Sequence, residues 1–266
     1  MANKLYEETH IQAIADAIRE KDGSTDTMLV SEMAEKISAI SGGGGDAGGL
    51  DALIDGSITE VTSDVNEVSD YAFAYKNNLK NANFPNATTL GLSSFTHSSN
   101  LTSVNAEKVA LLKPGVFYNC TNLKNVDFPN VTNVGTNAFY GCSSLINMRF
   151  PKATVIGSDC FRHCTNLERL CFLNLTKIDS NAFADCERLI SLRLQSSECC
   201  TLANANAFYR TCIKSGTGYI YVPSSLIEDY KVATNWTTFA DRFRALEDYT
   251  VDGTITGELD ETKIAA

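Results

Sequence analysis

The sequence lacks the features that place a chain in a membrane or mark it for export. No run of apolar residues approaches the roughly 18 that a membrane-spanning helix needs. The N-terminus has no basic segment followed by an unbroken apolar core, which a secretory signal peptide requires. We therefore expect a protein made in a cytoplasm, neither inserted into a membrane nor exported by the usual route.

Positive charge is scarce as well. Lys and Arg number 22 against 32 Asp and Glu, which gives a net charge of −10. An acidic surface repels phosphate backbones and anionic lipid surfaces. Nucleic acid is therefore not an expected partner.

The sequence also lacks a group of residues with the spacing that catalysis or metal binding needs. There is no glycine-rich phosphate loop with its lysine and no H-E-x-x-H motif. The cluster Cys160, His163 and Cys164 and the pair Cys199 and Cys200 match no common zinc spacing. We therefore expect no enzyme, no cofactor and no metal site.

What the sequence does contain is a repeat of 22 residues. Each copy has a phenylalanine, a leucine six residues later, and apolar residues at the ninth and eleventh positions after the phenylalanine. The phenylalanines are Phe73, Phe95, Phe117, Phe139, Phe161 and Phe183, and the leucines are Leu79, Leu101, Leu123, Leu145, Leu167 and Leu189. A period of 20–29 residues predicts a leucine-rich-repeat α/β solenoid, whose stacked coils bury one another's apolar columns.

Within each repeat the pattern predicts local structure. Phe-x-x-Cys-x-x-Leu has near-helical spacing and predicts a short helical or 3₁₀ turn. Val-x-Phe-Pro alternates with period two and predicts a strand, which proline ends because it has no N–H to donate. Gly91, Gly135 and Gly157 stand four residues before the phenylalanine, where we expect a tight turn.

Cysteine occurs nine times, an odd number that argues against a complete disulfide framework. Four of the nine stand three residues after a repeat phenylalanine: Cys120, Cys142, Cys164 and Cys186. Free cysteine behaves as a small buried hydrophobe. We therefore expect a column of buried thiols along the solenoid.

Composition divides the chain into five segments. They are a two-helix docking or oligomerisation module (1–41), a glycine-rich linker (42–49), the solenoid (50–218), a C-terminal cap (219–247) and a polar acidic tail (248–266). Helices as short as those expected in the first segment are marginal alone in water, so they need a partner protein or copies of themselves. A homo-oligomer is therefore expected. Asp252-Gly253 in the tail is typical of a hairpin turn.

Alternate residues of the predicted strands point away from the core and form a candidate binding face. The candidate binding residues are Asn125, Asp127, Asn147, Arg149, Arg169 and Arg193. Asn and Arg side chains suit polar ligands such as glycans or phosphorylated polymers. The alternative interpretation is a solvated face without a ligand.

The repeat motif resembles that of the BspA-like leucine-rich repeats. Its nearest copies are VGTNAFYGCSSLINMRFP (134–151) and IGSDCFRHCTNLERLCF (156–172). The chain departs from the motif at Lys113, where glycine is expected, at Leu173 and Gln195, where proline is expected, and before Phe208, where the spacing becomes 25. Members of this family are surface adhesins and phage structural proteins, so the resemblance implies attachment and not catalysis.

The flanks carry further resemblances. The segment 11–40, IQAIADAIREKDGSTDTMLVSEMAEKISAI, resembles a module at the N-terminus of tail and baseplate proteins of phages and prophages of Gram-positive bacteria, and 219–246 resembles the cap attached to such repeats. These resemblances imply a virion tail protein, made in the bacterial host cytoplasm. It would dock on tail or baseplate proteins through 1–41 and recognise a host-surface glycan or protein through the solenoid. The alternative is a bacterial cell-surface adhesin with the same repeats, which needs an export signal or a wall anchor.

Overall fold

The computed structural model describes residues 59–248, 250–251 and 254–255. Its internal contacts divide the chain into two units, Met1–Ile58 and Thr59–Ala266. The expected helical module (1–41), the glycine-rich linker (42–49) and the first residues assigned to the solenoid lie outside the described residues. In the part of the chain that is described, no helix is long and apolar enough to cross a membrane.

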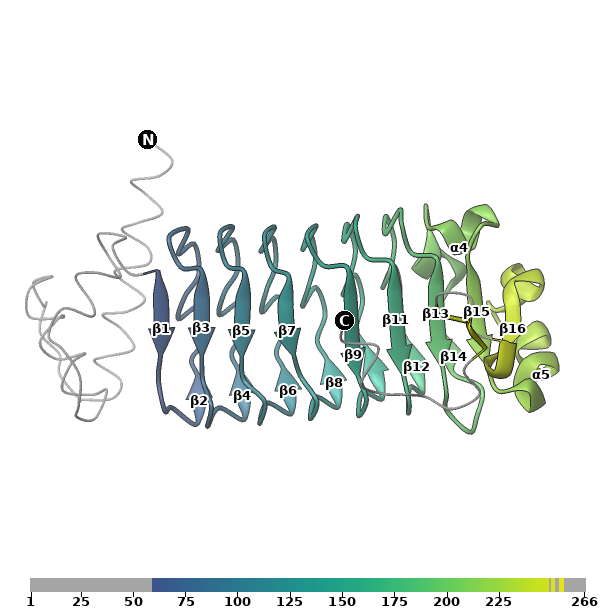
Figure 1. The fold of residues 1–266 in the computed structure, drawn as a ribbon, viewed down its shortest axis with the longest axis horizontal. Helices are drawn as coiled ribbons and strands as arrows, with labels where there is room; N and C mark the ends of the chain where they lie inside the picture. Colours follow the sequence, from purple (N-terminus) through teal and green to yellow (C-terminus); the bar gives the residue numbers. More distant parts are fainter. Residues whose placement is uncertain (1–58, 249, 252–253, 256–266) are drawn as a thin grey trace, which may run out of the picture. The chain divides into compact units, whose positions relative to one another are not determined.

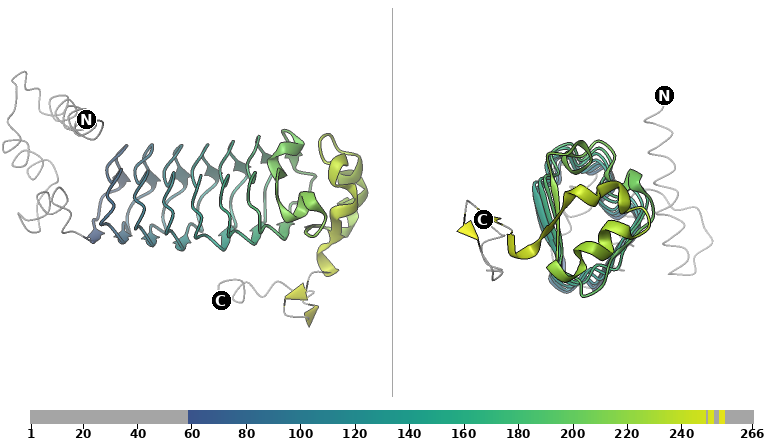
Figure 2. Two further views of the ribbon diagram at one scale, coloured as in Figure 1. Left: turned by 90° about the horizontal axis from the view of Figure 1, so that it is seen from above. Right: turned by 90° about the vertical axis from the view of Figure 1, so that its right-hand side faces the viewer.

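The second unit is a stack of coils whose parallel strands form two rows, one of longer strands in two sheets and one of two-residue strands in a single sheet (Figure 1). Seen from the end, the coils superpose in one closed outline, with the longer strands along one side (Figure 2). The longer strands form what we call the main row: β1 (Glu60–Thr62), β3 (Asn81–Asn83), β5 (Ser103–Asn105), β7 (Asn125–Asp127), β9 (Asn147–Phe150), β11 (Arg169–Phe172), β13 (Ser191–Leu194), β15 (Tyr219–Val222) and β16 (Phe243–Ala245). The two-residue strands form the minor sheet: β2 (Glu67–Val68), β4 (Thr89–Leu90), β6 (Leu111–Leu112), β8 (Asn133–Val134), β10 (Val155–Ile156), β12 (Lys177–Ile178) and β14 (Thr201–Leu202).

The main row consists of two sheets, β1 to β7 and β9 to β16, and within each sheet neighbouring strands pair in parallel. Strands of successive coils place equivalent repeat positions side by side. Leu170 of β11, for example, pairs with Met148 of β9 and with Leu192 of β13, and all three side chains are buried. The predicted strands and leucine-rich-repeat solenoid are therefore confirmed. β9 ends at Phe150, directly before Pro151, as expected from the missing N–H of proline.

The repeat phenylalanines stack as a continuous column through the core. Successive ring centroids are 5.2–5.7 Å apart from Phe73 to Phe183, and Phe208 continues the column at 5.5 Å from Phe183. The rings from Phe95 onward are fully buried. Each coil thus buries the aromatic ring of its neighbour, which a single coil cannot do for itself.

The segment after each phenylalanine differs from the prediction of a helical turn. A hydrogen bond from the Cys120 N–H to the Phe117 carbonyl closes one turn at 3.0 Å, but Asn119 has a φ of 56°, which stops a helix from forming. The same position takes a positive φ in each coil: Tyr75, His97, Asn119, Gly141, His163, Asp185 and Arg210. In the irregular last coil a 3₁₀ helix, η1 (Ala205–Phe208), precedes this segment and ends at its phenylalanine.

The glycines before the phenylalanine are required by close packing between coils and not by a tight turn. A Cβ on Gly157 would lie 2.7 Å from the Thr136 nitrogen, and one on Gly91 would lie 2.5 Å from the Ser69 carbonyl carbon. Neither glycine has a positive φ. The expected turn does begin at each glycine, as the hydrogen bond from the Cys160 N–H to the Gly157 carbonyl shows, but it is the backbone contact with the neighbouring coil that leaves no room for a side chain.

The four repeat cysteines form the predicted buried column. Each thiol donates a hydrogen bond of 2.9–3.0 Å to the carbonyl of a phenylalanine in the preceding coil, as Cys164 does to Phe139. All nine cysteines of the chain are free thiols, and these four are fully buried. These small buried thiols therefore stabilise the stack through packing and through hydrogen bonds between neighbouring coils.

The cap closes the last coil with aromatic side chains. Trp236 is fully buried 5.8 Å from the Phe208 ring, and its Nε1 donates to the Cys200 carbonyl at 2.6 Å. A strand, β15, ends directly before Pro223, and the helix that follows carries Tyr230 but ends before Trp236. The helices of the cap and last coil are α4 (Cys212–Ser215), η2 (Ser224–Leu226), α5 (Ile227–Val232), η3 (Thr237–Arg242) and η4 (Leu246–Asp248).

The tail begins with a short antiparallel hairpin. β17 (Thr250–Val251) pairs with β18 (Thr254–Ile255), which agrees with the turn predicted at 252–253. The two turn residues and residues 256–266 lie outside the described part of the chain.

Candidate binding surfaces

The outer face of the main row carries the binding residues that the sequence predicts. β9 and β11 are in register, so Asn147 lies beside Arg169, and Arg149 lies beside Cys171. Arg193 of β13 is next to Cys171 on the other side. Since paired strands are about 4.8 Å apart, Arg149 and Arg193 stand about two strand spacings from one another. Asn125 and Asp127 belong to β7, nearer the N-terminal end of the row.

Accessibility differs sharply along this face. Asn147, Arg169 and Asp127 are exposed and Arg149 is half-buried, but Arg193 is only 7% exposed. The expectation that Arg193 belongs to an accessible face is therefore wrong. Its position pairs in register with Tyr221 of β15, a bulky side chain supplied by the cap. The accessible part of the predicted site is centred on Arg149 and Arg169.

The asparagines at the N-terminal end of the face form hydrogen bonds to side chains of the neighbouring coil. Ser103 Oγ donates to Asn81 Oδ1 at 2.7 Å, and Asn105 Nδ2 donates to Asn83 Oδ1 at 3.0 Å. Such ladders satisfy polar side chains coil by coil. This end of the face therefore offers fewer unoccupied donors and acceptors than its asparagine content suggests.

A second surface feature lies on the turns between each minor strand and the next main-row strand. Five side chains from successive coils form a row of rings, which we call the aromatic row: Tyr75, His97, Tyr118, Tyr140 and His163. Neighbouring ring centroids are 4.8, 5.5, 4.6 and 5.2 Å apart in that order. Tyr75 is 41% exposed and the other four are half-buried, so the row belongs to the surface.

Two different repeat positions supply this row. Tyr75, His97 and His163 come second after the repeat phenylalanine, whereas Tyr118 and Tyr140 come first. The sequence analysis did not single out this row, because its rings alternate between the two positions. A search for ring side chains at either of the two positions would have found it.

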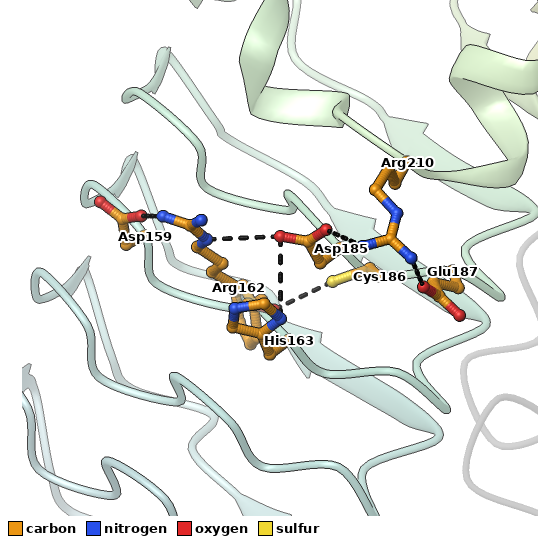
Figure 3. Close-up of polar contacts among 8 residues, drawn as sticks. Asp159, Arg162, His163, Asp185, Cys186, Glu187 and Arg210 are labelled. Carbon is orange, nitrogen blue, oxygen red and sulfur yellow. Dashed lines mark hydrogen bonds and ion pairs between the residues drawn. The ribbon is translucent and has the colours of Figure 1, made fainter.

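The aromatic row leads to a cluster of charged side chains around Asp185 (Figure 3). The Asp185 carboxylate is 5% exposed and lies 3.4 Å from Arg162 Nε, 3.1 Å from Arg210 Nη1 and 3.7 Å from His163 Nδ1. Arg162 also bonds Asp159, and Arg210 also bonds Glu187. The buried carboxylate thus fixes two guanidinium groups that remain partly exposed.

The two cysteine clusters singled out in the sequence lie in different surroundings. Cys160 and Cys164 are fully buried, and burial raises the pKa of both thiols well above the usual range. His163 instead faces Asp185 at the surface. Burial also raises the pKa of Cys199, to about 11. The described residues contain no group of three or more His, Cys, Asp or Glu side chains arranged to hold a metal ion.

Comparison with known proteins decides the family. The model described as "BspA type Leucine rich repeat region" matches residues 56–124 and 110–230, with six copies. The chain belongs to the BspA-type leucine-rich repeat family. The match does not extend to residues 11–40, so it gives no support to the tail-type module.

Among solved structures, this BspA-type chain is similar to a leucine-rich repeat protein of T. pallidum, with 21% identity and a TM-score of 0.54 over 57% of this chain and 78% of that one. It also resembles a leucine-rich repeat protein from Bacteroides ovatus (22% identity, TM-score 0.46, 71% of this chain, 54% of that one). A third is a leucine-rich cell surface protein from Faecalibacterium prausnitzii (17%, 0.44, 53% and 48%). The chain spans about half the length of the last two. No match was found among curated proteins.

Proposed function

We propose that this BspA-type chain is a non-enzymatic adhesin of a bacterial cell surface, whose solenoid attaches to a polar ligand on another surface. Membership of the family supports this role, because attachment is what the family resemblance implies. The observation that carries the proposal is the register of β9 and β11, which places Asn147, Arg149 and Arg169 together on one outward face.

The physical argument rests on preorganisation. The strands fix the backbone positions of these three residues, so a ligand meets donors whose spacing is already set. Arginine presents a planar fork of N–H donors that matches carboxylate, phosphate and vicinal hydroxyl groups. Arg169 is half exposed and lies 3.5 Å from Glu168, a neighbour that keeps its guanidinium near the surface of the sheet.

Removal of both arginines tests the proposal. Labelled full-length chain is titrated onto whole cells, and the variant Arg149→Ala/Arg169→Ala is compared with the wild type by flow cytometry. Loss of charged contacts at a binding interface weakens attachment at least about tenfold. The matched control is Lys152→Ala/Lys177→Ala, which removes the same charge elsewhere on the solenoid. An equal loss of attachment in both variants would mean that the loss comes from the change in net charge alone. Unchanged attachment of the arginine variant would contradict ligand binding at this face of the sheet.

A phage or prophage tail protein is the second candidate. It is favoured by the resemblance of residues 11–40 to a tail and baseplate module, and a glycine-rich linker follows that segment. In that role 1–41 docks on the tail, copies of the chain associate through it, and the solenoid recognises the host. Mass spectrometry of purified particles, together with antibody labelling of intact producing cells, separates the two. Detection in particles alone favours the tail protein, and labelling of cells alone favours the adhesin.

A further inference from the structure

The aromatic row has a composition that the backbone does not require. The second position after the repeat phenylalanine takes a positive φ, which asparagine and glycine adopt with little strain. Asn119 and Gly141 occupy it in two of the coils, but Tyr75 and His97 occupy it with φ values of 59° and 58°. A bulky residue in this conformation strains the backbone. Backbone geometry therefore does not explain the rings at this position.

The row is nevertheless continuous, because its ring comes from the first position after the repeat phenylalanine in some coils and from the second position in others. Where the strained position holds Asn119 or Gly141, the residue before it is Tyr118 or Tyr140, which fills the place of the missing ring. The row thus presents a ring in every coil from Tyr75 to His163. Burial does not explain it either, since none of the five side chains belongs to the fully buried core.

The rings combine an apolar body with polar atoms at the rim. Tyrosine hydroxyls and imidazole nitrogens donate and accept hydrogen bonds. Burial lowers the pKa of His97, so this imidazole is neutral at neutral pH. Tyr75 and His97 are stacked at 9° and Tyr118 and Tyr140 at 7°, so within these two pairs the rings cover one another's facing sides. The other two pairs are inclined, His97 to Tyr118 by 52° and Tyr140 to His163 by 79°, so their faces are not completely covered.

We propose that the aromatic row, together with the Arg162 and Arg210 guanidinium groups beside Asp185, binds a linear glycan that lies along the axis of the solenoid. A pyranose ring has apolar C–H groups and a rim of hydroxyl groups, which match the apolar edges, the partly open faces and the polar rim atoms of the tyrosine and histidine rings in the row. The ring spacing of 4.6–5.5 Å is comparable with the length of one sugar unit in an extended chain. Each coil therefore contacts about one sugar, and the two arginines donate hydrogen bonds to the hydroxyls of the last one.

This inference rests on the proposed attachment role and adds to it a second binding surface, separate from the arginine face, for which it names the ligand class. The outer face of the main row and the turns are separate parts of each coil, so variants on one leave the other in place. A glycan is also a repeating ligand, as the row is a repeating site. Several weak contacts along one chain add to a useful affinity without a deep pocket.

The test is affinity electrophoresis of the full-length chain in gels that contain barley β-glucan, xylan or hyaluronan, followed by titration of any polymer that retards it. The first variant, Tyr140→Leu, removes a ring and its hydroxyl but keeps an apolar side chain. The second, His97→Asn, places at a positive φ the residue that Asn119 already supplies in the next coil. The matched control is Tyr71→Leu, an exposed tyrosine outside the row. Thermal unfolding confirms that all three are folded.

We expect retardation of the wild type and of Tyr71→Leu, and an affinity at least about tenfold lower in Tyr140→Leu and His97→Asn. No retardation by any of the three polymers, or equal retardation of all variants, overturns the inference. The inference is also overturned if protease treatment of the target cells abolishes attachment while Tyr140→Leu and His97→Asn leave it unchanged, because the ligand is then a protein. Failure of the proposed function looks different, because the chain then binds glycan but neither labels producing cells nor attaches to other cells.

Discussion

Phe139 and Phe161 come from adjacent coils, and their rings lie 5.2 Å apart with an interplanar angle of 2°. Each ring is fully buried, and the Phe161 ring also lies 6.0 Å from Phe150. Because a solenoid is stabilised by contacts between neighbouring coils, the centre of the stack depends on this pair.

Phe161→Ala leaves a cavity between three coils, because the neighbouring rings cannot move together without displacing their own strands. We expect a loss of about 3–5 kcal/mol in the free energy of unfolding, measured by urea denaturation followed by circular dichroism. The control is Ile146→Ala, at a side chain that is 49% exposed and for which the loss is within about 0.5 kcal/mol. Similar losses in the two variants contradict a packed phenylalanine column.

The main row and its core are predictable from sequence because they repeat. Phe, Leu and Cys recur at fixed positions in successive coils, and stacking is the one arrangement that buries all of these columns. The minor sheet is not predictable in this way. A strand of two residues, such as Val155–Ile156, is too short to show an alternating pattern, and only its buried residue, Ile156, repeats as an apolar column.

The candidate surfaces were harder to predict because they depend on neighbours that are distant in the repeat. The buried Arg193 pairs in register with Tyr221, a residue of the cap that stands outside the 22-residue period. The aromatic row is hidden because its rings alternate between two repeat positions. The charged cluster around Asp185 draws Arg210 from the irregular last coil, where the spacing has changed to 25.

Gly157→Ala tests the close contact between coils. A Cβ at this position would lie 2.7 Å from the Thr136 nitrogen and 2.8 Å from the Gly135 carbonyl carbon, so the added methyl must push two backbones apart. We expect a loss of about 1–3 kcal/mol in the free energy of unfolding, from the overpacking alone. The control is Lys152→Ala, a surface change in the same region. A Gly157→Ala variant as stable as the wild type contradicts the backbone contact.

Because of the buried thiols, we expect the free energy of unfolding to depend on pH in the alkaline range. Burial raises the pKa of Cys120, Cys142, Cys164 and Cys186 well above the usual range. In the unfolded chain a cysteine has a pKa of about 8.5 and ionises above it, whereas the folded chain keeps the proton. The unfolded state then binds fewer protons, so stability is intact below about pH 8.5 and is lost as the pH rises.

Once a cysteine is fully ionised in the unfolded chain, each thiol that stays protonated in the folded chain lowers the free energy of unfolding by about 1.4 kcal/mol per pH unit. Cys164→Ala therefore has two effects that separate in one experiment. It lowers stability at pH 7, because the hydrogen bond to the Phe139 carbonyl and some packing are removed, and it flattens the decline between pH 9 and 10 by the contribution of one thiol. Val131→Ala also truncates a buried side chain but removes no proton, so its decline should parallel that of the wild type. Urea denaturation at several pH values measures both slopes. A Cys164→Ala slope equal to that of Val131→Ala would mean that the Cys164 thiol ionises as readily in the folded chain as in the unfolded one, which a thiol sealed between two coils and bonded to a carbonyl does not do.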